Sequence, residues 1–424
     1  MGVALAAENF PPPEFTTGYQ FPKATEPGPR DASLSLVDAA VLLTALSLAA
    51  YFALRRRSRR ELAILSVFCL LYLGFYRHGC VCAVGSFQNV ALAVADPGYV
   101  LPVVVGAFFV LPLLFALFFG RVFCSAVCPL GQAQEVVLLR AVKVPRWVDQ
   151  ALGVLPFLYL GVAVLYAALG SAFVVCRYDP FVLFFRLGGN LEMLIFGVAV
   201  LLLATVVGRP YCRFLCPYGA LLRLIAPFAR WRVRTTPTEC VNCHLCADAC
   251  PYGAIQPPNV TDARIGRLEG RSRLAWLVAA FPLILAAGGF LGWQSAPVLA
   301  KLDPTISLAN RVWLEEHGRV KGKTEASEAF ATQGTPSADL YREAAKIRKR
   351  FDGGSLLLGV WVGLVIVLRM ISLSVRRRRE AYQVDPGACV ACGRCFSACP
   401  VGRSVIAEAE GASISALTPG EEGR

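Results

Sequence analysis

Twelve of the sixteen cysteines in this 424-residue chain fall into four closely spaced groups. Two of the groups repeat the spacing Cys-x2-Cys-x2-Cys-x3-Cys-Pro, first as Cys240, Cys243, Cys246 and Cys250 and again as Cys389, Cys392, Cys395 and Cys399. Bacterial ferredoxins use this spacing, because a compact loop wraps three thiolates around one cubane cluster while the fourth cysteine reaches a cluster from another direction. Structural zinc sites typically use Cys pairs that lie well apart. The two copies therefore predict two [4Fe–4S] clusters.

The pairing of these cysteines has two solutions. In two-cluster ferredoxins the fourth cysteine of each motif binds the cluster of the other motif. We expect the same exchange here, with Cys399 completing the cluster of the first motif and Cys250 completing that of the second. Self-contained clusters within each motif are the alternative.

The other two groups belong to an internal repeat. The pattern Gly-Arg-x-x-Cys-x3-Cys-Pro occurs once with Cys124 and Cys128 and again with Cys212 and Cys216. Four thiolates from two related loops could hold a third cluster at the membrane surface. The alternatives are a flavin or quinone contact, a structural role, or a redox dithiol.

A last set of candidates lies where we expect the outer face of the membrane: Cys80, Cys82, Cys176, His78, Arg177 and Asp179. Oxidising conditions on that side permit a disulfide, and a redox centre is the competing role for these cysteines. The polar residues could bind a quinone headgroup, with His78 or Asp179 handling protons. The simpler reading is an ordinarily solvated Arg/Tyr anchor at the interface.

The elements that position these residues are predicted to be membrane helices. The chain is 56% hydrophobic and only 17% charged, with a mean hydropathy of +0.55, whereas soluble domains are about a quarter charged. Apolar runs long enough to cross a bilayer predict an all-α polytopic membrane protein with seven spans, at about 35–54, 61–77, 100–120, 151–172, 190–208, 274–293 and 353–373. The spans 61–77/100–120 and 151–172/190–208 read as a duplicated helix pair. The two ferredoxin motifs would form a small α+β unit.

Positive charge sets the expected orientation. Arg55–Arg60 follows the first span and is the strongest positive-inside signal, so the net charge of +13 indicates membrane orientation rather than nucleic-acid binding. The N-terminus is then outside, and both ferredoxin motifs and the C-terminus are cytoplasmic. This divides the chain into an outer tail (1–34), a membrane domain (35–208), a cytoplasmic segment (209–273), a helix–outer loop–helix insertion (274–373) and a cytoplasmic end (374–424). Segments 78–99 and 173–189 become short outer loops.

These motifs resemble the NosR/NapH group of membrane polyferredoxins. The resemblance covers roughly residues 60–262 and the last motif, and segments 79–89 and 176–181 look like the NosR branch. It implies electron transfer between the quinol pool or a flavin and partners serving respiratory reductases, with the twelve motif cysteines as ligands. The 34-residue tail is too short for the flavin-binding domain of a NosR protein.

The expected function is electron transfer in the inner (cytoplasmic) membrane, with the bilayer and redox proteins as partners, quinol as a further candidate, and no nucleic acid. The sequence contains no dinucleotide fingerprint, Walker loop or nucleophile–base pattern, which favours an electron-transfer subunit over a self-contained enzyme. A redox-sensing regulatory or maturation protein and a redox-coupled ion transport subunit are the alternatives.

Overall fold

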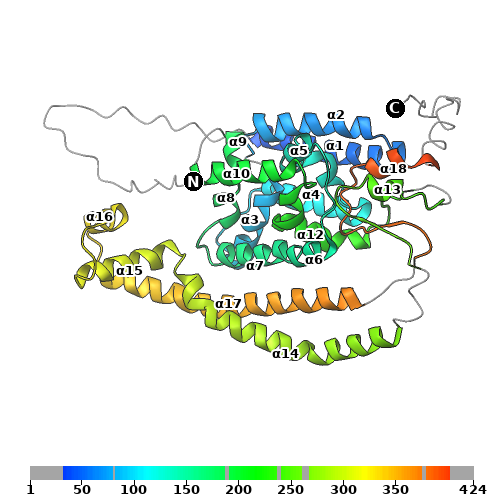
Figure 1. The fold of residues 1–424 in the computed structure, drawn as a ribbon. Helices are drawn as coiled ribbons and strands as arrows, with labels where there is room; N and C mark the ends of the chain where they lie inside the picture. Colours follow the sequence, from blue (N-terminus) through cyan, green and yellow to red (C-terminus); the bar gives the residue numbers. More distant parts are fainter. Residues whose placement is uncertain are drawn as a thin grey trace.

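The computed structural model describes residues 32–79, 82–186, 191–235, 240–259, 267–374 and 379–401, which are mostly helical (Figure 1). Within them, four helices are long and apolar enough to cross a membrane: Ser33–Arg56, Trp147–Ala168, Leu274–Ala300 and Ser337–Ser374. Three shorter apolar helices comprise residues Ala83–Ala95, Val103–Phe119 and Leu191–Ala204. The protein is therefore a helical, multi-pass membrane protein. Residues 1–31 of the predicted tail, Cys80, and residues 402–424 lie outside the described residues.

The predicted spans 35–54 and 61–77 correspond to two helical rods. The first joins α1 (Ala32–Tyr51) to the π-helical η1 (Phe52–Arg56), and the second joins α2 (Arg59–Cys69) to the π-helical η2 (Leu70–Tyr76). Ser58 begins the second rod by accepting a hydrogen bond from the amide of Glu61 at 3.4 Å, as an N-cap should. Near the opposite ends, Arg77 pairs at 2.8 Å with Asp38. Asp38 is fully buried, and a buried carboxylate requires such a partner.

The predicted outer loop 78–99 instead contains a buried helix, α3 (Ala83–Ala95). Its 13 residues reach about 20 Å, which is shorter than the roughly 30 Å hydrocarbon core. Ser86 and Gln88 interrupt the apolar run, so the hydropathy pattern did not reveal it. Both side chains are buried but hydrogen-bonded, and α3 packs against α4 (Val103–Phe119), α7 (Leu155–Ala168) and α12 (Pro217–Ile225).

Short helices link the two repeats. The remaining elements of this part are η3 (Phe123–Val127, π-helical), α5 (Pro129–Val136), α6 (Arg146–Leu152), α8 (Val174–Arg177), α9 (Val182–Arg186), α10 (Leu191–Ala204), α11 (Pro210–Phe214) and the 3-10 turn η4 (Ala226–Phe228). The helices α4 and α10 each lead into one Gly-Arg-x-x-Cys-x3-Cys-Pro element. The repeat seen in the sequence is therefore also a repeat of helix followed by cysteine turn.

A long hairpin lies along one side of the bundle (Figure 1). It consists of α14 (Arg267–Ala300) and α17 (Ser337–Ser374), with α15 (Pro304–Glu316) and α16 (Glu325–Thr332) at its far end. Glycines let the two helices touch along their backbones: a Cβ on Gly288 would lie 2.6 Å from the Gly359 carbonyl oxygen. Small residues at such spacing drive helix pairing in membranes. The predicted loop 294–352 is largely helical, and its basic run 346–350 lies within α17.

The ferredoxin motifs meet at the opposite end of the molecule from α15 and α16 (Figure 1). The strands β1 (Ile255–Gln256) and β2 (Gln383–Val384) pair antiparallel, with Ile255 opposite Val384. The short helices α13 (Leu245–Asp248) and α18 (Arg394–Ala398), one from each motif, also pack together. Two segments more than 120 residues apart in sequence therefore form one small unit.

Candidate iron–sulfur sites

Each Cys-x3-Cys-Pro element folds in the same way. The first cysteine lies in a short helix, and the second is the N-cap of the next helix, whose first residue is the proline: Cys128 precedes α5 and Cys216 precedes α12. Proline suits the first helical position because its missing amide has no partner there in any case. The Cys216 sulfur accepts a hydrogen bond from the amide of Gly219 at 3.2 Å.

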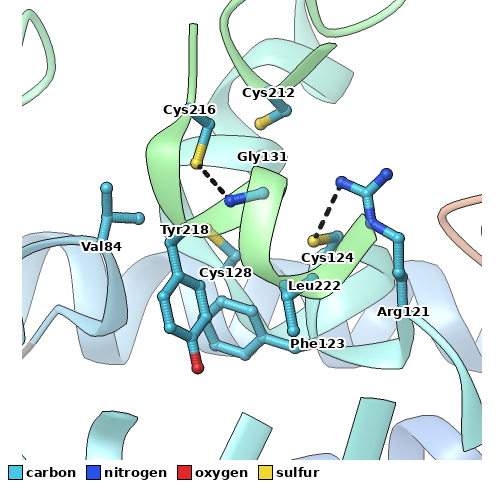
Figure 2. Close-up of a pocket in the computed structure, with 11 residues that line it drawn as sticks. Val84, Arg121, Phe123, Cys124, Cys128, Gly131, Cys212, Cys216, Tyr218 and Leu222 are labelled. Carbon is cyan, nitrogen blue, oxygen red and sulfur yellow. Dashed lines mark hydrogen bonds between the residues drawn. The ribbon is translucent and has the colours of Figure 1, made fainter. Parts of the chain in front are cut away.

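The four thiols of the two elements line one cavity, which we name the upper cavity: Cys124, Cys128, Cys212 and Cys216. Figure 2 shows the four sulfurs facing a common space, two from each repeat. Gly131 also lines this space, and a Cβ there would lie 3.2 Å from a guanidinium nitrogen of Arg209, which is a tight contact. Arg121 reaches the rim, with its guanidinium 3.8 Å from the Cys124 sulfur.

A second space, the ferredoxin cavity, is lined by cysteines from both ferredoxin motifs: Cys250, Cys389, Cys392 and Cys395. Ile255 and Val384 of the strand pair form part of its wall. The structure thus brings Cys250 to the second motif, as the exchanged pairing expects.

The remaining ferredoxin thiols lie together as well. Cys246 is within electrostatic range of Cys240, Cys243 and Cys399, and Cys399 is buried. Burial raises the pKa of the Cys246 thiol to about 11. Burial likewise raises the pKa of Cys389 to about 12. Such thiols are protonated in the empty protein and must lose their protons to bind a metal.

Residues with positive φ turn the backbone of both ferredoxin loops at equivalent positions. Asn242 and Ala391, each two residues after the first cysteine of its motif, have φ of 53° and 55°. His244 and Gly393, each four residues after it, have φ of 65° and 83°. Consecutive turns of this kind can point backbone amides into a concave space that favours negative charge. The donor set and the loop shape fit a cluster with four thiolate ligands.

No three Cys, His, Asp or Glu side chains within the described ranges meet at the spacing of ligands to a single ion. The thiols instead surround open space, in the upper cavity and in the ferredoxin cavity alike.

A buried ionic network connects the two cavities. Glu135 accepts hydrogen bonds from Arg209 Nε at 3.1 Å and from the Tyr252 hydroxyl at 2.5 Å. Its other oxygen accepts one from Arg394 at 2.6 Å. Arg209 also donates to the carbonyl of Cys124. One residue from each of the four cysteine elements therefore meets in this network.

The charges of the network stabilise one another. Although burial opposes ionisation, the adjacent Arg209 and the Tyr252 hydrogen bond lower the pKa of Glu135 to about 2. The Arg209 side chain is only 2% exposed and lies within electrostatic range of Cys212 and Cys392. It therefore interacts with one cysteine of each cavity.

The sequence alone did not reveal the role of these residues. The Gly-Arg dipeptide before each cysteine pair was visible, but the arginines counted only as positive charge. In the structure Arg121 donates to the Gly387 carbonyl at 3.0 Å. Arg57 donates to the carbonyl of Thr235 at 2.8 Å and lies over the Phe396 ring. Both side chains dock the ferredoxin unit onto the helices.

The outer-face candidates are separated by the structure into two sets. The Cys82 and Cys176 thiols lie within electrostatic range of each other, and the Asp179 carboxyl group lies within range of both. His78 instead contacts the Phe185 carbonyl oxygen at 3.1 Å, and exposed Arg177 lies over the Tyr178 ring. Cys82 is the N-cap of α3, so it lies at the buried start of that helix rather than in an open loop.

Comparison with known families gives two matches. Residues 101–146 and 190–236 match one 4Fe-4S binding domain, and residues 233–256 and 382–402 match another. The first covers both Cys-x3-Cys-Pro elements, and the second covers both ferredoxin motifs.

Individual relatives cover part of the chain. YccM of Escherichia coli (strain K12), whose name describes an electron transport protein, is 30% identical over 157 residues, which are 33% of this chain and 43% of YccM. MJ0750 of Methanocaldococcus jannaschii is 30% identical over 192 residues, covering 43% of this chain and 77% of that protein. The regulatory protein NosR of Pseudomonas aeruginosa is 29% identical over 218 residues, covering 46% of this chain and 30% of NosR.

No solved structure matches the chain significantly. The alignments span less than half of YccM and of NosR, so what those whole proteins do does not transfer directly. The matched domains, the cysteine cavities and the apolar helices nevertheless agree with one another. The chain belongs to the 4Fe–4S ferredoxin-type membrane proteins related to NosR, NirI, YccM and MauN.

Proposed function

We propose that this protein is an electron-transfer subunit with three [4Fe–4S] clusters arranged in series. One cluster occupies the upper cavity, one the ferredoxin cavity, and one is held by Cys240, Cys243, Cys246 and Cys399. The observation that carries the proposal is that each cavity is lined by four thiols contributed by two separate elements. When bound, each cluster supplies one-electron chemistry.

The residues of the chain hold these clusters in a fixed order. The network of Glu135, Arg209, Tyr252 and Arg394 lies between the upper cavity and the ferredoxin cavity. Because it ties all four cysteine elements together, it fixes the separation of the two clusters. Its arginines also place positive charge beside both, which favours their reduced, more negative state.

We further propose seven membrane spans, with the N-terminus outside and the ferredoxin unit in the cytoplasm. The cluster of arginines at 55–60 supports this orientation through the positive-inside rule. In this arrangement the clusters relay electrons between a quinol, flavin or ferredoxin donor and a respiratory reductase or its accessory system.

Iron content tests the proposal. Anaerobically purified protein should contain about twelve iron atoms per chain, four for each cubane. The double variant Cys124→Ser/Cys212→Ser should retain about eight. The matched control Cys69→Ser changes a buried thiol outside all four motifs and should retain the full content. About eight iron atoms in the unmodified protein would refute the third cluster, and stoichiometric zinc without broad visible absorption would refute all three.

The exchanged pairing has its own test. Cys399→Ala should alter the EPR signal of the cluster bound mainly by the first motif, and Cys250→Ala should alter that of the second. Each variant damaging the cluster of its own motif would establish self-contained sites instead.

A regulatory role is the second candidate. The name of the matched NosR proteins describes them as regulatory. The clusters of this chain would then sense redox state rather than sustain electron flow. Turnover separates the two roles, because an electron carrier must be reduced and reoxidised repeatedly in native membranes supplied with a respiratory donor.

A further inference from the structure

The first turn of α3 lies between the upper cavity and a second pair of thiols. Val84, the second residue of the helix, lines the upper cavity (Figure 2). Cys82 caps the same turn, and its sulfur accepts a hydrogen bond from the Val84 amide at 3.3 Å. Cys82 also lies within electrostatic range of Cys128, a lining residue of the cavity. One helical turn, about 5.4 Å in pitch, thus joins Cys82 to the proposed cluster site.

Cys176 is held against the same turn. Its sulfur lies where Gly85 has no side chain, because a Cβ on that glycine would be 3.1 Å from the sulfur. Gln88 donates a hydrogen bond to the sulfur at 3.4 Å. The side-chain oxygen of Gln88 accepts a hydrogen bond from the backbone amide of Val175 at 3.0 Å. Gln88 is fully buried, so it is a polar side chain built into the protein to position Cys176.

The two thiols differ in access. Cys176 is exposed, whereas Cys82 is partly buried beside the cavity wall. Asp179 is buried and lies within electrostatic range of both sulfurs. An accessible thiol beside a protected thiol is the arrangement that thiol–disulfide exchange requires, in which one sulfur attacks and the other resolves.

We propose that Cys82 and Cys176 form a redox-active dithiol–disulfide pair that takes electrons from the upper-cavity cluster and passes them to a disulfide of a partner protein. This deepens the proposed function and depends on it. Two one-electron transfers from the reduced cluster break the Cys82–Cys176 bond, and each sulfur takes up one proton, which Asp179 can carry.

The reduced pair then acts on the partner. The Cys176 thiolate attacks the partner's disulfide, forming a mixed disulfide and releasing one partner thiolate, which takes up a proton. Cys82 attacks the mixed disulfide at the Cys176 sulfur and releases the second partner thiol. The pair ends oxidised and the partner ends as a dithiol, so two electrons and two protons have been transferred.

The first test follows the pair by differential alkylation and mass spectrometry in anaerobically purified protein. After mild oxidation with oxidised glutathione, Cys82 and Cys176 should be joined, and dithionite should reduce them. In the Cys124→Ser/Cys212→Ser protein, reduction of the Cys82–Cys176 disulfide by dithionite should take at least tenfold longer. A phosphine, which reduces disulfides directly, should still reduce it. Cys69→Ser and Cys80→Ser should behave like the unmodified protein.

Several results would overturn the proposal. They are two free thiols after oxidation, equal dithionite reduction with and without the cluster ligands, or loss of the bond in Cys80→Ser. Iron content is measured on the same samples. Eight instead of twelve iron atoms in the unmodified protein would refute the cluster itself, which distinguishes failure of the proposed function from failure of the pair.

The second test identifies the attacking sulfur with an aromatic disulfide as the probe. In Cys82→Ser protein, the probe should leave a stable adduct on Cys176. In the reduced unmodified protein Cys82 should displace that adduct, so that two equivalents of aromatic thiol are released and no label remains. A stable adduct on Cys176 in both proteins would refute the resolving role of Cys82.

Discussion

Replacing Glu135 by glutamine tests whether the ionic network stabilises the junction of the four cysteine elements. The carboxylate of Glu135 contacts Arg209, Arg394 and Tyr252. Glutamine keeps the size of the side chain and can accept hydrogen bonds, but it removes the charge. Arg209, which is 2% exposed, then remains buried without its carboxylate partner.

Two routes give the size of the effect. The pKa of Glu135 falls from an ordinary value near 4.5 to about 2 in the folded protein. At about 1.4 kcal/mol per pKa unit, the charge contributes about 3 kcal/mol to the free energy of unfolding at neutral pH. Breaking a buried ion pair by removing one partner costs about 3–5 kcal/mol. The carbonyls that Arg209 retains favour the lower end, so we expect about 3 kcal/mol.

Chemical unfolding in detergent micelles, followed by tryptophan fluorescence, measures this difference. Because the folded-state pKa is lower than the unfolded one, the contribution is complete above the unfolded value and is lost as pH falls toward the folded value. The difference in the free energy of unfolding between the unmodified protein and Glu135→Gln should therefore be constant from pH 8 to about 6. It should become smaller below about pH 4.5.

A matched control is Asp339→Asn, which removes an exposed ion pair with Arg342 on α17. The two side chains are 57% and 76% exposed, and surface pairs of this kind contribute little. Equal stability of the Glu135→Gln and Asp339→Asn proteins would refute the stabilising role of the network. A gap that widens on acidification would refute the assigned direction of the pKa shift.

Three further outcomes are expected. Arg209→Gln removes a buried positive charge near Cys212 and Cys392, so the midpoint potentials of both neighbouring clusters should fall in an EPR-monitored titration. The control is Arg230→Gln, because Arg230 is exposed and stacked on Trp231, and it should leave both potentials unchanged. Gly359→Leu forces apart the backbones of α14 and α17 and should cost about 1–3 kcal/mol, measured as a lower melting temperature in detergent. Gly353→Leu places the same side chain on α17 where a Cβ would meet nothing within 4 Å, and should be tolerated. Alkaline phosphatase fused after Gly334 should be active and fused after Arg379 inactive; the reverse would overturn the proposed orientation.

Much of the helical architecture followed from hydropathy. The run 35–54 alone predicts a membrane helix, and Ser33–Arg56 is a helix long and apolar enough to cross a membrane. The 13-residue α3 was missed, because Ser86 and Gln88 interrupt its apolar run, and the partners of buried Gln88 lie far away in the sequence. Gln88 accepts from Val175 and donates to Cys176, and a single-sequence pattern contains no record of such contacts.

The cysteine spacing by itself determined the iron–sulfur chemistry, because the loop that wraps a cluster is about ten residues long and its geometry is local. Spacing also revealed the repeat that supplies Cys124 and Cys212. Only the tertiary structure decided which elements meet: Cys250 beside the second motif, Glu135 and Arg209 between two cavities, and Cys82 one helical turn from the upper cavity. The physical reason is that these neighbours are brought together by the packing of helices distant in sequence, and no local signal encodes that packing.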